Sequence, residues 1–409
     1  MGNQQWNTKR EISVKDIVGF TCQSLSSMGS EIRRVFLLGQ KLQEENPDID
    51  LVDLSLGNPD LEPPVAVMEE LGRLASEHVP GAHRYMDNAG YPEIREWLSR
   101  RLSDSEGVAL TRDQVFMTCG AAGALQILLR TLLDPGDEVI LLAPYFSEYR
   151  PYVTNMGAVP VIVGSDESHC PDLEKLRGAL TARTRAILVN SPNNPSGVIY
   201  PESVLRSISQ VLIDFREQSG RVVHLISDEP YARLLFNPSD AVSVLKLYPA
   251  AWLVRSHSKD LGLAGERIGY LAWGSQLARP ETLNALRNSA RALGFVNAPA
   301  LMQRLLPRVF DARVDVSQYQ QRVDAFVDIL QAGGLECVRP RASFFVFPKS
   351  PVADDHLFTE TLVRAGVLAV PGSSFGKPGY FRCSLTQPID RVKEGARRIV
   401  ECAHSKALK

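Results

Sequence analysis

The sequence lacks the features by which several classes of protein are recognised. Its six cysteines lie far apart and form no C-x-x-C pair, so neither a zinc site nor a disulfide framework is indicated. No apolar run is long enough to span a membrane, and the polar start of the chain has no apolar segment of a secretory signal. The formal net charge of −2 gives no basic excess for nucleic acid. We therefore expect a cytoplasmic protein that keeps its thiols reduced and binds no metal, membrane or nucleic acid.

The middle of the chain has the alternating pattern of an α/β fold. The 409 residues are enough for two domains, and a hydrophobic content of 44% is enough for a large core. Short apolar runs alternate there with longer helical patterns, which indicates a mostly parallel sheet flanked by helices. In such a sheet the ligand site lies at the carboxyl ends of the strands. Strands are expected at residues 115–118, 139–144, 159–164, 186–192, 224–230, 252–258 and 269–274.

The two ends of the chain predict a second, smaller α+β domain. Helices are expected at about 29–46, 314–333 and 354–365, and short apolar runs such as FFVFP and VLAVPG separate the later ones. We assign residues 62–300 to the large domain. Residues 1–61 and 301–409 together are expected to form the small domain.

Residues 256–270, SHSKDLGLAGERIGY, place one lysine among groups that bind phosphate. Lys259 follows an apolar strand-like run, where burial and nearby positive charge can lower the pKa of an amine and make it able to form a Schiff base. Ser256 and Ser258 offer hydroxyl donors, and Arg267 offers a forked guanidinium, for a phosphate dianion. For Lys259 taken alone, the alternative is a solvated surface lysine.

A second anion site is predicted at the start of a helix. In TCGAAGAL (118–125), small residues form the turn from a strand into a helix. The free N–H groups of Gly120, Ala121 and Ala122 would point at an anion there. Many strand-to-helix turns share this pattern, so the stretch is a weak signal when taken alone.

Two further strand ends carry groups that suit a heterocyclic ring. Asp228, in DEPY, can hold a protonated ring nitrogen, and Tyr231, three residues on, can donate to a ring oxygen. Asn194, in SPNNPSG, can donate to the same oxygen. The alternatives are a helix cap for Asp228 and an ordinary turn for Asn194. Together with the lysine and the phosphate ligands, these groups describe a site for pyridoxal 5′-phosphate.

Four motifs in this order resemble those of the fold-type I, class I/II aminotransferases, the aspartate aminotransferase-like family. SHSKDLGLAGERIGY resembles S-x-S-K-x(5)-G-x-R-x-G-Y, SPNNPSG resembles N-P-[ST]-G, and SDEPY resembles D-E-x-Y. VPGSSFG followed by PGYFRCSLT resembles the carboxylate-binding segment of the family. The resemblance extends from about residue 54 to 386 and implies a seven-stranded, mostly parallel sheet in the large domain.

The resemblance implies a role in cofactor binding for several residues. Lys259 would form a Schiff base with the cofactor and move protons. Asp228 would pair with the pyridine nitrogen, and Tyr231 and Asn194 with the 3′ oxygen. Phe146, where many relatives have tryptophan, would stack on the ring; an ordinary core phenylalanine is the alternative.

The resemblance also implies contacts to the phosphate and to the substrate. Tyr85 would reach the phosphate from the partner subunit of a homodimer, and its alternative is a buried structural tyrosine. Arg382 and the backbone of Gly57 would bind the α-carboxylate of the substrate, and Asn194 is also expected to bind the substrate.

Three positions have no role in this interpretation. Asp260 directly follows the lysine and could perturb the local charge or cap the next turn. Ala264 stands where relatives usually have proline. Arg291 is one residue out of register with an arginine that binds a second substrate carboxylate in relatives, so a place on a helix surface is at least as well supported.

The predicted function is transfer of an amino group between an α-amino acid and a 2-oxo acid. The alternative is elimination, replacement or carbon–carbon bond formation on an amino acid such as S-adenosylmethionine, because the motifs specify only cofactor binding and removal of the α proton. Transcription regulators that use this fold carry an added DNA-binding domain. The roughly fifty residues before the matched region contain no basic recognition helix.

Overall fold

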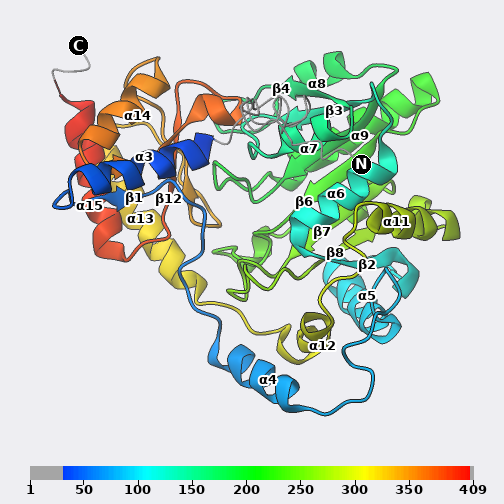
Figure 1. Ribbon diagram of the computed structural model, residues 1–409. Helices are drawn as coiled ribbons and strands as arrows, with labels where there is room; N and C mark the ends of the chain where they lie inside the picture. Colours follow the sequence, from blue (N-terminus) through cyan, green and yellow to red (C-terminus); the bar gives the residue numbers. More distant parts are fainter. Residues whose placement is uncertain (1–30, 406–409) are drawn as a thin grey trace, which may run out of the picture.

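The computed structural model describes residues 31–405 and contains a large sheet and two small ones (Figure 1). The large sheet has the strand order β2-β8-β7-β6-β5-β3-β4. Strand β8 runs antiparallel to both of its neighbours, and the other neighbouring pairs are parallel. The predicted mostly parallel, seven-stranded sheet is therefore confirmed. Its strands are β2 (Val115–Thr118), β3 (Glu138–Leu142), β4 (Val159–Val163), β5 (Thr184–Asn190), β6 (His224–Asp228), β7 (Ala251–Ser256) and β8 (Gly269–Trp273).

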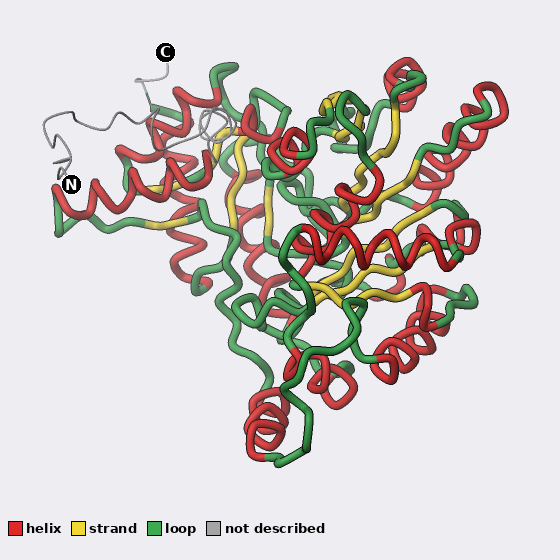
Figure 2. The backbone as a smooth tube through the Cα atoms, turned by 45° about the vertical axis from the view of Figure 1, so that its right-hand side comes forward, coloured by secondary structure: helices red, strands yellow, loops and turns green. Residues whose placement is uncertain are grey.

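Helices cover both faces of this sheet, as Figure 2 shows with strands in yellow and helices in red. Several of them begin or end at residues that favour a helix boundary. Asp315 and Asp354 accept hydrogen bonds from backbone N–H groups at helix starts, and Gly107 and Gly220 end helices in the left-handed conformation. The helices are α3 (Glu31–Glu45), α4 (Val65–Ser76), α5 (Pro92–Glu106), α6 (Gly120–Leu132), α7 (Tyr149–Asn155), α8 (Leu173–Ala179), α9 (Glu202–Ser219), α10 (Val244–Leu247), α11 (Pro280–Ala292), α12 (Ala300–Val309), α13 (Val316–Ala332), α14 (Asp355–Arg364) and α15 (Ile389–Ala403). No helix within residues 31–405 has both the length and the apolar character that crossing a membrane requires.

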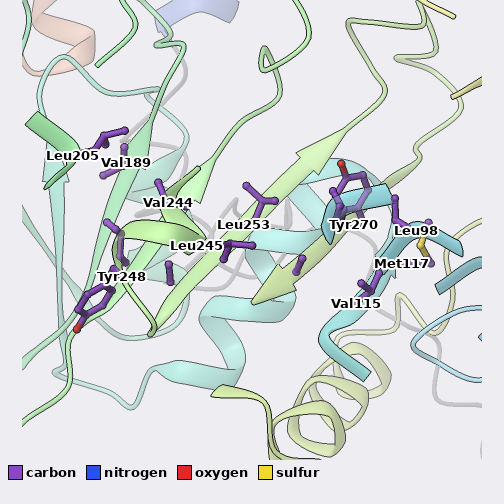
Figure 3. Packing of buried hydrophobic residues seen from close by; sticks show 14 of the residues in the cluster. Leu98, Val115, Met117, Val189, Leu205, Val244, Leu245, Tyr248, Leu253 and Tyr270 are labelled. Carbon is purple, nitrogen blue, oxygen red and sulfur yellow. The ribbon is translucent and has the colours of Figure 1, made fainter. Parts of the chain in front are cut away.

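The large sheet separates two apolar cores because successive side chains of a strand point to opposite faces. On β7, Leu253 belongs to the core that holds side chains of α4, α5, α9 and α12, whereas Trp252 and Val254 belong to the core that holds side chains of α6, α7 and α11. Figure 3 shows part of the first core, with Leu253 among its neighbours. This alternation also decides which residues at the strand ends can face a ligand.

A third core lies around the two small sheets. Strand β1 (Val52–Asp53) pairs in parallel with β10 (Val367–Leu368). An early segment of the chain is therefore paired with a late one. Strand β12 (Phe381–Ser384) lies between β11 (Val370–Pro371) and β9 (Phe345–Val346). Helices α13, α14 and α15 contribute buried side chains to this core.

The boundaries between the domains stay a prediction. The pairing of β1 with β10 agrees with a small domain formed by both ends of the chain. Helix α12, however, contributes Met302, Leu305, Leu306 and Val309 to a core of the large sheet. The connection from α12 to α13, near residues 310–315, is therefore where the chain passes from one core to the other.

Replacing Leu253 by alanine should destabilise the large sheet. Leu253 is fully buried in the interior strand β7, and Leu→Ala changes at such positions cost about 2–5 kcal/mol of unfolding free energy. Val159→Ala is the matched control, because Val159 is 48% exposed on the edge strand β4 and should change stability by less than about 0.5 kcal/mol. Equal urea midpoints for the two variants would contradict this description of the core.

Candidate active site

A cavity of about 380 Å³ lies at the carboxyl ends of β5, β6 and β7. Strands β9 and β12 of the small sheet supply its opposite wall, so the site lies between the two parts of the fold. Most of the residues singled out in the sequence line this cavity, namely Gly57, Ala121, Ala122, Phe146, Asn194, Asp228, Tyr231, Ser256, Ser258, Lys259, Arg267 and Arg382.

Lys259 lies three residues beyond the end of β7, is half-buried and lines the cavity. Its Nζ donates a hydrogen bond to the carbonyl oxygen of Gly57 at 2.9 Å. Burial lowers the pKa of Lys259 to about 8, and the positive charges of Arg267 and Arg382 act in the same direction. With this pKa roughly a tenth of the amine is uncharged at pH 7, and this uncharged form can act as a nucleophile or general base.

Asp228 is the last residue of β6 and presents an acceptor without a partner. The phenol of Tyr149 donates to Asp228 Oδ2 at 2.5 Å, whereas Oδ1 has no hydrogen-bond partner among the described residues. Burial raises the pKa of Asp228 to about 7, although the hydrogen bond from Tyr149 opposes the rise. A buried acceptor that stays unpaired is costly, so Oδ1 is suited to accept an N–H or to share a proton with a ligand.

Asn190 connects Asp228 to the loop that carries Asn194. Its amide nitrogen donates to the carbonyl oxygen of Asp228 at 2.8 Å, and its Oδ1 accepts from the backbone N–H of Asn194 at 2.7 Å. The side chain of Asn194, which lines the cavity together with Tyr231, in turn accepts a hydrogen bond from Arg382 Nη1 at 3.1 Å. The amide and phenol groups are thereby held beside one another at the edge of the cavity.

The start of α6 and Arg267 form one positively charged corner. Gly120 has φ +70°, and a Cβ at this position would lie 2.7 Å from Arg267 Nη2, so only glycine fits. The guanidinium donates to the carbonyl oxygens of Ala264 at 2.9 Å and Cys119 at 3.5 Å. Four further groups that can bind an anion line the adjoining wall: the first turn of α6 at Ala121 and Ala122, and the serines Ser256 and Ser258.

Arg382 is a buried cation on β12. Its guanidinium lies between the rings of Phe345 and Phe375, at 5.0 and 4.9 Å from their centroids, and it donates to the carbonyl oxygen of Ser55. Its Nε has no partner among the described residues. Burial lowers the pKa of Arg382 to about 10, which still leaves it charged at neutral pH. The geometry suits a bidentate contact with a carboxylate.

Four residues weighed in the sequence lie outside the cavity lining, and Asp260 is one of them. Gly120 lies just behind it, at the start of α6. Tyr85 is 90% exposed on this single chain, so the alternative of a buried tyrosine does not describe it. Arg291 is exposed near the end of α11, which agrees with a place on a helix surface.

The family described as aminotransferase class I and II matches residues 49–399. The chain belongs to this family. It is 34% identical to a probable aspartate/prephenate aminotransferase of Thermus aquaticus, over 88% of this chain and 93% of that protein. It is 31% identical to the aspartate aminotransferase of Thermotoga maritima, over 87% of this chain and 92% of that protein.

Solved structures agree with this assignment. An aminotransferase from Eubacterium rectale superimposes with a TM-score of 0.90 at 32% identity, covering 94% of this chain and 98% of that one. The aspartate aminotransferase of Thermus thermophilus, solved with maleate, gives 0.80 at 30% identity, covering 96% and 100%. The predictions of fold-type I and of an aminotransferase are confirmed, and elimination, replacement or carbon–carbon bond formation is not favoured.

Two residues of this aminotransferase were not recognised in its sequence. Tyr149 donates to Asp228, and Asn190 joins Asp228 to Asn194. Asn190 ends β5 as Asp228 ends β6, so the position of a polar residue at the end of an apolar run was an available signal. Tyr149 lies in a short helix after β3, and nothing in the pattern of that helix distinguishes it from a core tyrosine.

The lowered pKa of Lys259 in this aminotransferase can be tested in the absence of any cofactor. An amine-selective reagent should modify Lys259 at a rate that rises with pH and reaches half its maximum near pH 8, because burial disfavours the ammonium form. Mass spectrometry of the peptide that contains Lys259 measures this rate.

Removing a nearby charge provides the matched comparison. Arg267→Met takes away a positive charge that helps to lower the pKa of Lys259, so the midpoint should move to higher pH. A midpoint near the ordinary 10.5 in the unaltered protein, or a downward shift in the variant, would contradict the described electrostatics.

Proposed function

We propose that this aminotransferase uses pyridoxal 5′-phosphate, bound in the cavity through Lys259. The observation that carries the proposal is the unpartnered Oδ1 of Asp228, a residue that lines the same cavity as Lys259, whose pKa is lowered. A protonated pyridine nitrogen would satisfy this acceptor and keep the carboxylate charged. Membership of the class I and II family supports the same cofactor.

The other groups around the cavity fit the remaining parts of the cofactor. Arg267, the two serines and the start of α6 would hold the phosphate, and a side chain at Gly120 would displace the guanidinium from this position. Tyr231 and Asn194 would donate to the ring oxygen. Phe146 lines the cavity and would cover one face of the ring.

When bound, pyridoxal phosphate supplies an aldehyde for amines and a ring that withdraws electrons from the α carbon of the substrate. The neutral amine of Lys259 would take the proton from the α carbon of the amino donor. In the second half of the reaction it would return a proton to the α carbon of the acceptor. Asp228 would hold a proton at the ring nitrogen. Arg382 and the backbone of Gly57 would bind the α-carboxylate and so orient the α carbon towards Lys259.

The amino donor and acceptor are proposed to be an α-amino acid and a 2-oxo acid. Relatives carry the names aspartate aminotransferase and aspartate/prephenate aminotransferase, which makes aspartate the first donor to test. Among the described residues, the lysines and arginines that line the cavity are Lys259, Arg267 and Arg382, and each already has a proposed partner. A second substrate carboxylate would therefore need a cation from outside this lining.

We also propose that the active unit is a homodimer. Tyr85 is 90% exposed, and Val65, Met68 and Val79 nearby in the sequence are exposed as well, at 73%, 51% and 47%. Large apolar side chains exposed together are typical of a surface that a partner covers. In such a dimer Tyr85 would contact the phosphate bound by the other subunit.

An absorbance experiment tests the proposed chemistry. The protein without cofactor should develop a visible band on addition of pyridoxal phosphate. Single amino acids are then added, with aspartate, glutamate, alanine and an aromatic amino acid as donors. The correct donor should remove the band and release its 2-oxo acid in an amount equal to the bound cofactor.

The control for this experiment is Lys259→Ala, which should lose turnover because no other residue of the cavity lining within residues 31–405 offers an amine. Undiminished turnover in Lys259→Ala would refute the assignment of Lys259. If the band returns while the substrate loses a side-chain group, the reaction is elimination or replacement instead.

The proposed dimer is tested at Tyr85. Tyr85→Phe removes one hydroxyl from an exposed ring and should leave the fold of the single chain unchanged. If Tyr85 reaches the phosphate in a dimer, the variant should bind pyridoxal phosphate about tenfold more weakly, as expected for the loss of ~1.4 kcal/mol. Equilibrium titration measures the affinity and sedimentation velocity the mass. A monomeric, fully active protein would contradict the proposal.

A further inference from the structure

Asp260, the residue after Lys259, has a buried carboxylate that faces away from the cavity. Its side chain is 3% exposed and does not line the cavity. Its Oδ2 accepts a hydrogen bond from Arg233 Nη1 at 2.9 Å and lies 3.0 Å from Nδ1 of His257. Burial alone would raise the pKa of Asp260, but His257 and Arg233 outweigh it and hold the pKa below its ordinary value. Asp260 thus neither caps the next turn through its side chain nor adds a negative charge to the cavity.

The contacts of Asp260 join three segments of the chain. Arg233 belongs to the turn after β6, two residues beyond Tyr231. Its Nη2 also donates to the carbonyl oxygen of Ala312 at 3.2 Å. The carbonyl oxygen of Asp260 itself accepts from the backbone N–H of Val314 at 2.7 Å. Asp260 therefore binds the lysine loop both to the turn that carries Tyr231 and to the connection between α12 and α13.

A second anchor fixes the same loop on its other side. Gly262 has φ +68°, and a Cβ at this position would lie 2.9 Å from the backbone nitrogen of Pro63 and 3.0 Å from the carbonyl oxygen of Leu61. Lys259 Nζ binds Gly57 in the same segment. The backbone around Lys259 is thereby held between the segment before α4 and the network of Asp260.

We infer that Asp260 is a positioning residue for the Lys259 amine: through Arg233 and His257 it fixes the loop so that this amine stays in the cavity. The inference rests on the proposed function of Lys259. It does not require Asp260 to touch the cofactor or the substrate. His257, which also packs against the rings of Tyr270 and Phe310 at 5.9 and 5.5 Å, links the network to the body of the large domain.

The substitution Asp260→Asn keeps the size of the side chain and removes its charge. The half-buried Arg233 then loses its counter-charge, and the loop is expected to shift because a charge left unpaired away from solvent is costly. A displacement of a catalytic group by about 1 Å can cost up to about 100-fold in rate. We expect kcat to fall by about 10- to 100-fold, with the KM of the amino donor nearly unchanged, because Arg382 and Gly57 are left in place.

The affinities for two forms of the cofactor distinguish an effect on the position of the Lys259 amine from general damage to the fold. Pyridoxal phosphate reacts with Lys259, whereas pyridoxamine phosphate has the same ring and phosphate but no aldehyde. Asp260→Asn should weaken the binding of pyridoxal phosphate by about tenfold and leave that of pyridoxamine phosphate within about twofold. Equilibrium titration of the protein without cofactor measures both affinities.

The arginine end of the network supplies a second pair of variants. Arg233→Met should reproduce the selective loss of pyridoxal phosphate binding, because it removes the arginine that pairs with Asp260. Arg233 is the more exposed partner of this pair. Arg233→Lys keeps one charged donor and should restore most of the affinity. If Asp260→Asn does not fold, this pair carries the test alone.

Glu138→Gln is the matched control for the loss of a buried carboxylate. Glu138 is buried, as Asp260 is, it pairs with Arg183 at 2.8 Å, and it lies at the opposite end of the large sheet from the cavity. This variant should lose stability without any change in the ratio of the two affinities.

The outcomes distinguish this inference from the proposed function. If the unaltered protein gives no visible band with pyridoxal phosphate, the proposed function itself fails. If that band forms but Asp260→Asn weakens both cofactor forms equally, or neither, then Asp260 has only a structural role or none and the inference is overturned.

Discussion

The need to lower the pKa of one amine beside two fixed cations is the constraint on which the rest of the site depends. Lys259, Arg267 and Arg382 line one cavity, Arg382 buried and Arg267 exposed, and the positive charges of both arginines repel the ammonium form of the lysine. A guanidinium cannot give up its proton at ordinary pH, so only the lysine can relieve this repulsion. The neighbouring carboxylate of Asp260 would favour the ammonium form if it faced the cavity. It binds Arg233 instead, which leaves the low pKa of Lys259 intact.

The alternation of side chains along two strands explains how Asp228 can remain partly unpaired. Asp228 and Ser256 end β6 and β7 and line the cavity. The residues beside them, Glu229 and Arg255, point to the other face of the sheet, where Arg255 pairs with Glu229 at 2.7 Å and with Glu106 at 2.8 Å. These buried ion pairs hold the strand ends in place from behind. The ligand-facing side is therefore free to carry an acceptor that only a ligand satisfies.

The sequence was sufficient to predict the strands and most of the cavity lining, because both follow from local pattern. Apolar runs located the strands of the large sheet, and polar residues at their ends located Asp228 and Lys259. The contacts of Tyr149 and the direction of the Asp260 side chain could not be predicted. Both depend on segments far apart in the sequence, 79 residues for Tyr149 with Asp228 and 27 for Arg233 with Asp260. For the same reason, the sequence alone could not locate the domain boundary near α12.

The segment between β1 and α4 connects the two groups that are proposed to act on one carbon atom of the substrate. Lys259 Nζ binds the carbonyl oxygen of Gly57, and Arg382 binds that of Ser55, two residues earlier. The α-carboxylate and the α proton belong to the same carbon, so the arginine and the lysine need a fixed spacing. Since they lie on different parts of the fold, no single secondary-structure element can set it. A short backbone segment that both side chains contact provides that common reference, and the packing of Gly262 against Leu61 and Pro63 ties it to the lysine loop.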